Sequence, residues 1–390
     1  MKGIAVQNEK TVMLQEIAMQ PGFVRDNVDV MLDFMRGVVA PREPGTLRHG
    51  FMIGCGDSYC AALAARMHMS KATGRFIEPV EALEFSRYLV ADLPADSFVF
   101  GVSNSGTVSR TIEGVRLARE RGAWTFGVTV SADNKLARTA ETLIKVNATP
   151  NIKEQPDGTR VVTPGTITYT ASMLGLVIAG IALGERIGYL DAAKVASLVD
   201  ELHALPDAMA KADATASKLS EEIAATFTRD RKTVILGGGP NYATAYFGMA
   251  KWFEGLTRPC HLSELEEWAH EHYFITDEAT DTIIILPPGA GHDRGLEQAQ
   301  AAREMGSRVI IIGEEGDEAA KQASDIYFAM PPVPETLSPF VYKVPFEYLS
   351  CHISAKQNIA FLGFDNRKRQ EVNFRQIFNS AQKAETGAAA

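Results

Sequence analysis

A short loop rich in hydroxyl groups is the strongest candidate binding element in this chain. Residues 103–107 read Ser-Asn-Ser-Gly-Thr. The apolar run Phe98–Val102 before the loop has the length and bulk of a buried strand, and a helical pattern follows through Arg121. Unpaired N–H groups and the helix dipole favour an anion at such a corner, and small hydroxyl side chains add donors. The alternative is a serine-rich helix cap with a purely structural role.

Lys251 and Glu254 are candidates for acid–base chemistry in the second half of the chain. They are three residues apart in a predicted helix and therefore share one face. A carboxylate can act as a general base, and a neighbouring ammonium can stabilise negative charge that develops on an oxygen. By spacing alone, an exposed ion pair on a helix surface is the more common explanation.

The segment Ser263–Phe274 supplies histidines and carboxylates. The unperturbed pKa of histidine lies near neutrality, which makes His270 and His272 candidate acids. On a strand these two residues would share a face and could both bind Zn²⁺, but a third clear ligand is not evident, so we expect no metal. A surface loop with incidental histidines is the alternative. The carboxylates around them are Glu264, Glu266, Glu267 and Glu271.

Each half of the chain carries the same two motifs. Phe51–Ala64 matches Val234–Phe247, with the glycines aligned 183 positions apart. Leu117–Ala123 matches Ala301–Ser307 at an offset of 184 positions. A near-constant offset across two separate motifs indicates a duplicated domain.

Apolar strands alternate with amphipathic helices in both halves. This order predicts an α/β fold with two tandem, doubly wound parallel sheets, whose ligands lie outside the carboxyl ends of the strands. The expected strands are 49–53, 97–102, 124–130, 142–146, 233–236, 282–286, 308–312 and 325–328. The expected helices of the first half are 58–72 and 108–121.

Helical segments are expected before and between the two domains. An N-terminal helix over 11–39 should end at the Pro-rich residues 41–45, and a helical stretch from 168 to 225 should break near 184–189 and at Pro206. The expected divisions are a lead (1–44), a first domain (45–190), a connector (191–225), a second domain (226–364) and a C-terminal tail (365–390). In the second domain the counterpart of the hydroxyl-rich loop is Pro287–Gly291, which has no hydroxyl group.

The composition is that of an ordinary globular protein. The 390 residues are 46% hydrophobic and 22% charged, and the net charge of −9 argues against an extensive nucleic-acid surface. The four cysteines lack metal-ligand spacing and are typical of reduced thiols in a cytoplasmic protein. The N-terminus lacks the apolar core of a signal peptide. No run approaches the roughly 20 apolar residues of a membrane helix, so no membrane association is expected.

Over nearly its whole length the chain resembles two consecutive domains of the sugar isomerase (SIS) family, whose fold is flavodoxin-like. It is most similar to the isomerase half of glutamine–fructose-6-phosphate aminotransferase and to stand-alone glucosamine-6-phosphate deaminases and fructosamine-6-phosphate deglycases. The family loop Ser-Gln-Ser-Gly-x-Thr is matched by the hydroxyl-rich loop, and the family turn Gly-x-Gly-x-Ser by Gly54, Gly56 and Ser58. The resemblance implies a phosphosugar site formed by Gly56, Ser58, Ser103, Asn104, Ser105, Thr107 and Thr166.

The resemblance also implies catalytic roles. Glu254 matches the family base and Lys251 the lysine before it, while Glu267 and His270 match the family's Glu-x-x-His. That histidine enters the partner subunit's site as the ring-opening acid, so the resemblance implies a homodimer with shared sites. In the family the C-terminal tail supplies a lysine, and Lys368 is the lysine near that position here, although the simple register places Val372 there.

These features predict a cytoplasmic enzyme without cofactor that acts on a sugar phosphate. The expected reaction is isomerisation, deamination or deglycation through an enolamine, and deamination or deglycation is favoured because no glutaminase half is expected: no cysteine follows Met1. The alternative is a non-catalytic sugar-phosphate sensor, but the acidic and apolar N-terminal lead argues against binding to DNA.

Overall fold

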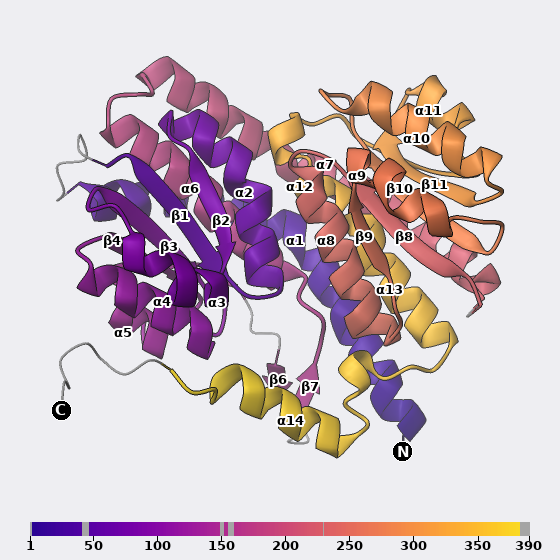
Figure 1. Ribbon diagram of the computed structural model, residues 1–390, viewed down its shortest axis with the longest axis horizontal. Coiled ribbons are helices and arrows are strands. Elements are labelled where there is room, and N and C mark those ends of the chain that lie inside the picture. The colour runs from indigo at the N-terminus through magenta and orange to yellow at the C-terminus, as the bar shows by residue number, and fades with distance from the viewer. Residues whose placement is uncertain (1, 41–46, 149–151, 155–159, 229, 383–390) are drawn as a thin grey trace.

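The protein contains two five-stranded parallel sheets that stand side by side, with helices on their faces (Figure 1). This computed structural model describes residues 2–40, 47–148, 152–154, 160–228 and 230–382. The first sheet has the strand order β2-β1-β3-β4-β5, and the second, taken from its far edge, has the equivalent order β9-β8-β10-β11-β12. The shared order confirms the expected α/β fold with two tandem sheets.

All eight expected strands are present, with ends that move by at most two residues. The first sheet consists of β1 (His49–Gly54), β2 (Ile77–Glu81), β3 (Ser97–Val102), β4 (Trp124–Thr129) and β5 (Thr142–Lys145). The second consists of β8 (Lys232–Gly237), β9 (His261–Glu264), β10 (Thr280–Leu286), β11 (Arg308–Glu314) and β12 (Ile326–Met330). A hairpin pairs β6 (Ile152–Glu154) with β7 (Arg160–Val162).

Sequence analysis missed β2 and β9, which are the equivalent edge strands of the two sheets. Each is short, and neither carries a continuous apolar run: β2 reads IEPVE and β9 reads HLSE. Proline is tolerated in an edge strand because one side of the strand needs no ladder partner. Their pairing with β1 and β8 therefore depends on the position of those strands in the folded protein, which the spacing of apolar residues does not show.

The helices include those expected at 11–39, 58–72, 108–121 and 168–225, together with several that were not predicted. They are α1 (Lys2–Val39), α2 (Asp57–Thr73), α3 (Ala82–Glu84), α4 (Ser109–Glu120), α5 (Lys135–Thr139), α6 (Ile167–Arg186), α7 (Ala192–Thr226), α8 (Asn241–Lys251), α9 (Leu265–His270), α10 (His292–Glu304), α11 (Glu318–Gln322), α12 (Pro339–Tyr342), α13 (Val344–Lys356) and α14 (Arg367–Phe378). Single π-helical turns follow α3 (Phe85–Leu89) and α8 (Trp252–Leu256).

The expected break near residues 184–189 is confirmed, because α6 ends at Arg186 and α7 begins at Ala192. The expected break at Pro206 is wrong, since α7 continues through this buried proline. Helix α7 packs against α1 and α13, and these contacts offset the backbone hydrogen bond that proline cannot donate. The first helix starts earlier than expected, at Lys2, and its Pro-rich end at 41–45 lies outside the described residues.

Helix α6 is the centre of the core. Residues 167–184 are all buried, and the helix packs against α1 and α2. The expectation that no apolar run reaches membrane length is therefore wrong: by length and composition α6 could cross a membrane, but here its apolar window is fully enclosed by the protein. A helix that is apolar around its whole circumference is typical of a deep core position.

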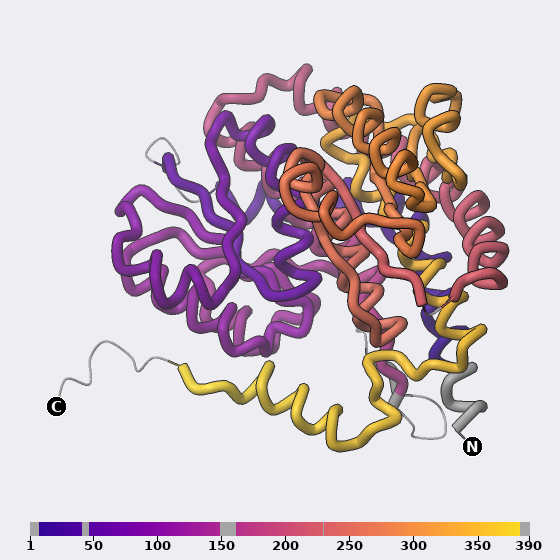
Figure 2. The backbone as a smooth tube through the Cα atoms, turned by 45° about the vertical axis from the view of Figure 1, so that its right-hand side comes forward, coloured from indigo at the N-terminus to yellow at the C-terminus, as the bar shows by residue number. Residues whose placement is uncertain are grey.

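The C-terminal segment returns from the second domain to the first. Figures 1 and 2 both show α14 running beneath the first sheet and its helices, away from the rest of the second domain. Arg110 donates hydrogen bonds to Ser380 and Ala381, and Gln382 Nε2 donates to Ser109 O over 2.9 Å. The tail is therefore anchored to the start of α4, beside the hydroxyl-rich loop.

Candidate active site

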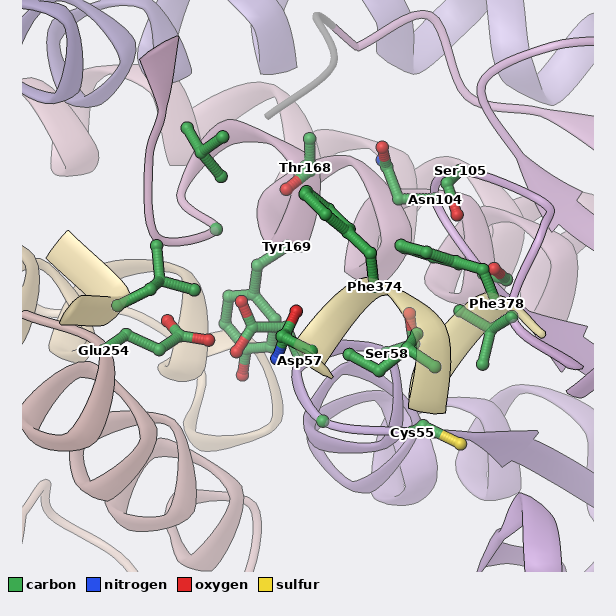
Figure 3. Close-up of a pocket in the computed structure, with 18 of the residues that line it drawn as sticks. Cys55, Asp57, Ser58, Asn104, Ser105, Thr168, Tyr169, Glu254, Phe374 and Phe378 are labelled. Carbon is green, nitrogen blue, oxygen red and sulfur yellow. The ribbon is translucent and has the colours of Figure 1, made fainter. Parts of the chain in front are cut away.

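A cavity of about 650 Å³ opens at the carboxyl edge of the first sheet (Figure 3). Its floor is formed by the turn after β1 and the loop after β3, and one side by the start of α6. Glu254 enters from the second domain, and α14 forms the remaining side. The predicted site residues among those that line it are Gly56, Ser58, Ser103, Asn104, Ser105 and Glu254.

The hydroxyl-rich loop offers donors to this cavity. Ser103 is almost fully buried, and its hydroxyl finds no hydrogen-bond partner within the described residues; the same is true of Asn104 Nδ2. Thr107 does not line the cavity, but its hydroxyl lies 2.9 Å from Ser105 Oγ and so orients that side chain. Buried polar groups are normally paired, so these unpaired donors point to a polar ligand.

Gly106 gives the loop its shape. Its φ is +64°, and an added Cβ would lie 2.1 Å from the side chain of Asn134. Only glycine adopts this conformation readily and allows such a close approach. Asn134 in turn accepts a hydrogen bond from Ala137 N at the start of α5, so the loop is fixed to the neighbouring strand-to-helix connection.

Arg110 adds a positive charge that the sequence analysis missed. It lies one residue inside α4, lines the cavity next to the loop, and forms a 2.5 Å ion pair with the buried Glu113. No basic residue occurs in the loop itself, but the first turn of the following helix brings one to the same corner. Together with the helix N-terminus this charge favours an anionic group there.

Lys251, Asp57 and Glu254 form a charge cluster at the other end of the cavity, in which the Lys251 side chain is fully buried and the two carboxylates are partly exposed. Lys251 Nζ lies 2.8 Å from Asp57 Oδ2, 2.5 Å from Glu254 Oε2 and 3.1 Å from the carbonyl oxygen of Gly165. The three donors of the ammonium are thus matched by three acceptors. Lys251 and Glu254 are in contact, and the pair is partly buried rather than on the open surface: the Lys251 side chain is fully enclosed and 29% of the Glu254 side chain is exposed. Asp57 was not among the predicted site residues.

The cluster shifts the titration of its members. Burial raises the pKa of Glu254 to about 7, although the ammonium of Lys251 partly offsets this effect. For Lys251 burial alone would lower the pKa, but the carboxylates of Asp57 and Glu254 outweigh it and raise the pKa above its usual range. Lys251 is therefore a permanent cation, whereas Glu254 changes its charge near neutral pH.

Helix α14 closes the cavity with an aromatic face that the sequence analysis did not anticipate. Phe374, Ile377 and Phe378 recur at helical spacing and line the cavity with Asn373 and Gln376. In Figure 3 Phe374 and Phe378 lie over the space between Ser105 and Asp57. The signal was available in the sequence as a single apolar stripe on an otherwise charged helix. Lys368, by contrast, is exposed and does not line the cavity.

Three further predicted residues do not line this cavity. Thr166 is buried one residue beyond Gly165, and its hydroxyl has no partner within the described residues. Glu267 and His270 lie on the exposed side of α9, where His270 Nε2 is 3.2 Å from Glu266 Oε1. Within one chain the structure therefore does not bring His270 to Glu254. No group of three His, Cys, Asp or Glu side chains in the described parts of the chain could hold a metal ion.

The second sheet has a smaller cavity of about 330 Å³ at the corresponding edge. Carboxylates line it, including Glu264 and Glu335, beside the hydroxyl-free loop Pro287–Gly291. A phosphate would meet like charge there. The two domains have therefore diverged: the first keeps the hydroxyl-rich loop at this edge, and the second contributes Glu254 to the same cavity.

Residues 48–175 and 226–356 match the family model described as the SIS domain. The chain belongs to the SIS domain family. This confirms the resemblance that the loop and turn motifs indicated. Two copies of the SIS domain account for the repeated motifs and for the equivalent strand orders.

Curated relatives of this SIS chain are full-length aminotransferases. It is 27% identical over 354 residues to glutamine–fructose-6-phosphate aminotransferase (isomerizing) of Gloeobacter violaceus, a match that covers 89% of this chain and 56% of that protein. The equivalent protein of Methanothermobacter thermautotrophicus is also 27% identical, over 348 residues, with 89% and 55% covered. The chain thus spans about half the length of the curated relatives it matches.

Solved structures share the fold. The C-terminal domain of glucosamine-fructose-6-phosphate aminotransferase from Francisella tularensis superposes with a TM-score of 0.76 at 20% identity, covering 88% of this chain and 96% of that one. Glucosamine-6-phosphate deaminase from Thermotoga maritima superposes with a TM-score of 0.65 at 15% identity, covering 89% and 95%. At these identities the likeness is one of fold.

Proposed function

We propose that this SIS protein is an enzyme that acts on an amino-sugar or fructosamine phosphate, in the cytoplasm and without a cofactor. The observation that carries the proposal is the position of Glu254, which enters the same cavity as the hydroxyl-rich loop and is held there by Lys251. A substrate whose phosphate lies on the loop presents the carbons at its other end to this carboxylate.

The phosphate would be bound by several groups of the first domain. Ser103 and Asn104 bring donors that lack partners within the described residues, and Arg110 brings a charge. Charge-assisted hydrogen bonds are about twice as strong as neutral ones, so these donors suit a phosphate better than a neutral sugar end.

Glu254 would move a proton between adjacent carbons. It removes a proton from C2 of an open-chain amino sugar, or from C1 of a fructosamine, and the electron pair of that C–H bond forms an enolamine. Return of the proton to the neighbouring carbon gives an imine, which water hydrolyses to a carbonyl compound and ammonia or an amine. A base with a pKa near the working pH suits this transfer, and Glu254 meets that condition.

We expect ring opening to depend on a second subunit. His270 is exposed in a single chain, with 65% of its side chain accessible, and an acid at neutral pH is what opening a sugar ring requires. In a homodimer with shared sites, the partner subunit's His270 would reach this cavity.

The choice of amine chemistry over simple aldose–ketose isomerisation rests on the tail. Among the described residues no lysine of the tail lines the cavity, where α14 places phenylalanines instead. The test is a screen of glucosamine 6-phosphate and fructosamine 6-phosphates for release of ammonia or amine, with the matching non-phosphorylated sugars as controls. Release that requires the phosphate supports the proposal. Tight binding without turnover or proton exchange would favour the sensor alternative.

A further inference from the structure

Asp57 has two carboxylate oxygens in different situations. Oδ2 accepts a hydrogen bond from Lys251 over 2.8 Å. Oδ1 is buried and finds no hydrogen-bond partner within the described residues, although Asp57 lines the cavity. In Figure 3 the side chain lies between Tyr169 and Ser58, on the same side of the cavity as Glu254. The fold provides a hydrogen-bond partner for Oδ2, whereas Oδ1 lacks one among the described residues.

The hydrogen bond to Lys251 uses only one oxygen of residue 57, although the charge of Asp57 also helps to raise the pKa of Lys251. The ammonium already has Glu254 and the carbonyl oxygen of Gly165, and a neutral amide oxygen would serve as the third acceptor. A carboxylate instead leaves Oδ1 unpaired, and a buried unpaired acceptor is costly. The cost is recovered if a ligand supplies the missing donor.

Gly165 leaves room for the carboxylate of Asp57 beside Lys251. A Cβ on residue 165 would lie 2.2 Å from Asp57 Oδ2, so only glycine permits this approach. The same residue accepts a hydrogen bond from Lys251. Lys251 therefore holds the carboxylate of Asp57 in a position that a side chain at residue 165 would block.

The charge balance indicates the kind of donor that is missing. At this end of the cavity Asp57 and Glu254 face one cation, Lys251, while Arg110 lies at the opposite end and is paired with Glu113. In the state in which Glu254 can act as a base its carboxylate is ionised, and the cluster then carries one excess negative charge. A protonated amine matches both the charge and the unpaired Oδ1, whereas a hydroxyl group matches only the oxygen.

We propose that Asp57 is the specificity-determining residue that binds the protonated nitrogen of the substrate through Oδ1. This inference rests on the proposed function, since it assumes that the phosphate occupies the hydroxyl-rich loop. It restricts the substrate class to sugar phosphates that carry an ammonium group on one of the carbons next to Glu254. The site would then select such amines over simple aldose or ketose phosphates when the substrate binds.

Unreactive open-chain probes test the inference. Glucitol 6-phosphate and its 1-amino-1-deoxy and 2-amino-2-deoxy analogues lack the carbonyl group and differ only by a hydroxyl or an ammonium group. Calorimetry with wild-type protein should show one amino analogue binding at least tenfold more tightly than glucitol 6-phosphate, since a charge-assisted hydrogen bond contributes about 10–100-fold. Preference for the 2-amino analogue would indicate a deaminase substrate, and preference for the 1-amino analogue a deglycase substrate.

Asp57→Asn provides the second arm. The amide keeps an oxygen for Lys251, so this variant should fold and bind glucitol 6-phosphate within about threefold of wild type while losing its preference for the amine. Asp133→Asn is the matched control, because it removes one negative charge from a side chain that is 94% exposed, and it should keep the preference. A preference that survives Asp57→Asn would overturn the inference.

The wild-type comparison separates the two proposals even if Asp57→Asn fails to fold. Equal binding of all three probes would overturn the role of Asp57 and leave the phosphosugar site intact. Binding of none of them would overturn the proposed function itself.

Discussion

Replacement of Glu254 by glutamine tests the assignment of the base. Glutamine has the size of glutamate and keeps an oxygen near Lys251, but it cannot accept a proton from carbon. Lys251 retains Asp57 and the carbonyl oxygen of Gly165, so the buried ammonium keeps all three acceptors and the fold should persist. Loss of a positioned general base lowers the rate by about 10²–10⁴, equivalent to about 3–5 kcal/mol of transition-state stabilisation.

The assay is exchange of the carbon-bound proton of the substrate with D₂O, followed by NMR. Glu254→Gln should bind the phosphosugar with nearly normal affinity, melt within a few degrees of wild type and exchange at least 100-fold more slowly. Glu297→Gln, which changes an exposed carboxylate on α10, is the matched control and should exchange normally.

The pH dependence provides an independent check on the same residue. With a pKa of about 7, Glu254 is about half ionised at pH 7, and kcat/KM should fall about tenfold for each pH unit below 6. Exchange at the wild-type rate by Glu254→Gln would refute the assignment. Glu267 would then be the next candidate, and the register carried over from the family would be wrong in the second domain.

Three further predictions concern the anion loop, the assembly and acid stability. The double change Ser103→Ala with Ser105→Ala should weaken phosphosugar binding well over tenfold, with little change in melting temperature, and unchanged KM and kcat would reject the loop as the anion site. Mixing Glu254→Gln protein with His270→Ala protein should restore some activity, whereas a fully active monomer in sedimentation would exclude shared sites. Burial lowers the pKa of His68 to about 4, so that on acidification the unfolded state binds a proton before the folded state does. The free energy of unfolding should therefore fall by about 3 kcal/mol between pH 6.5 and 4. Denaturant titrations should show that His68→Leu removes most of this pH dependence.

The fold could be predicted because buried strands and helices show as apolar runs or regularly spaced apolar residues in the sequence. Strands such as β3 are buried at every position, so a continuous apolar run marks them without knowledge of their neighbours. Edge strands such as β2 and β9 have no continuous apolar run. They form because the backbone N–H and C=O groups of the adjacent strand are available for pairing. Pro206 failed as a helix breaker for a related reason: packing with distant helices overrode a local preference.

The candidate site was predictable only where local chemistry is distinctive. The loop around Ser105 could be found because hydroxyls, a glycine and a helix start occur together. Asp57 could not be found this way, because its importance depends on Lys251, which is 194 residues away. The aromatic face of α14 was not predicted, because the helical spacing of Phe374 and Phe378 does not show which distant part of the chain they pack against.

The duplication explains why the chain has one site of this kind among its described residues rather than two. Both domains keep the glycine turn after their first strand for packing: a Cβ on Gly237 would lie 2.2 Å from Asn241 O, and one on Gly54 would lie 2.8 Å from Ser58 C. Such glycines are needed whether or not a ligand binds. The hydroxyl of Ser103 in the next loop has no partner within the described residues, as expected for a group that a ligand would need, and the corresponding loop of the second domain has no hydroxyl group. Instead, that domain extends α8 by the π-helical turn that carries Glu254 to the cavity at the edge of the first sheet. Under our proposal, one copy binds the anion and the other supplies the base.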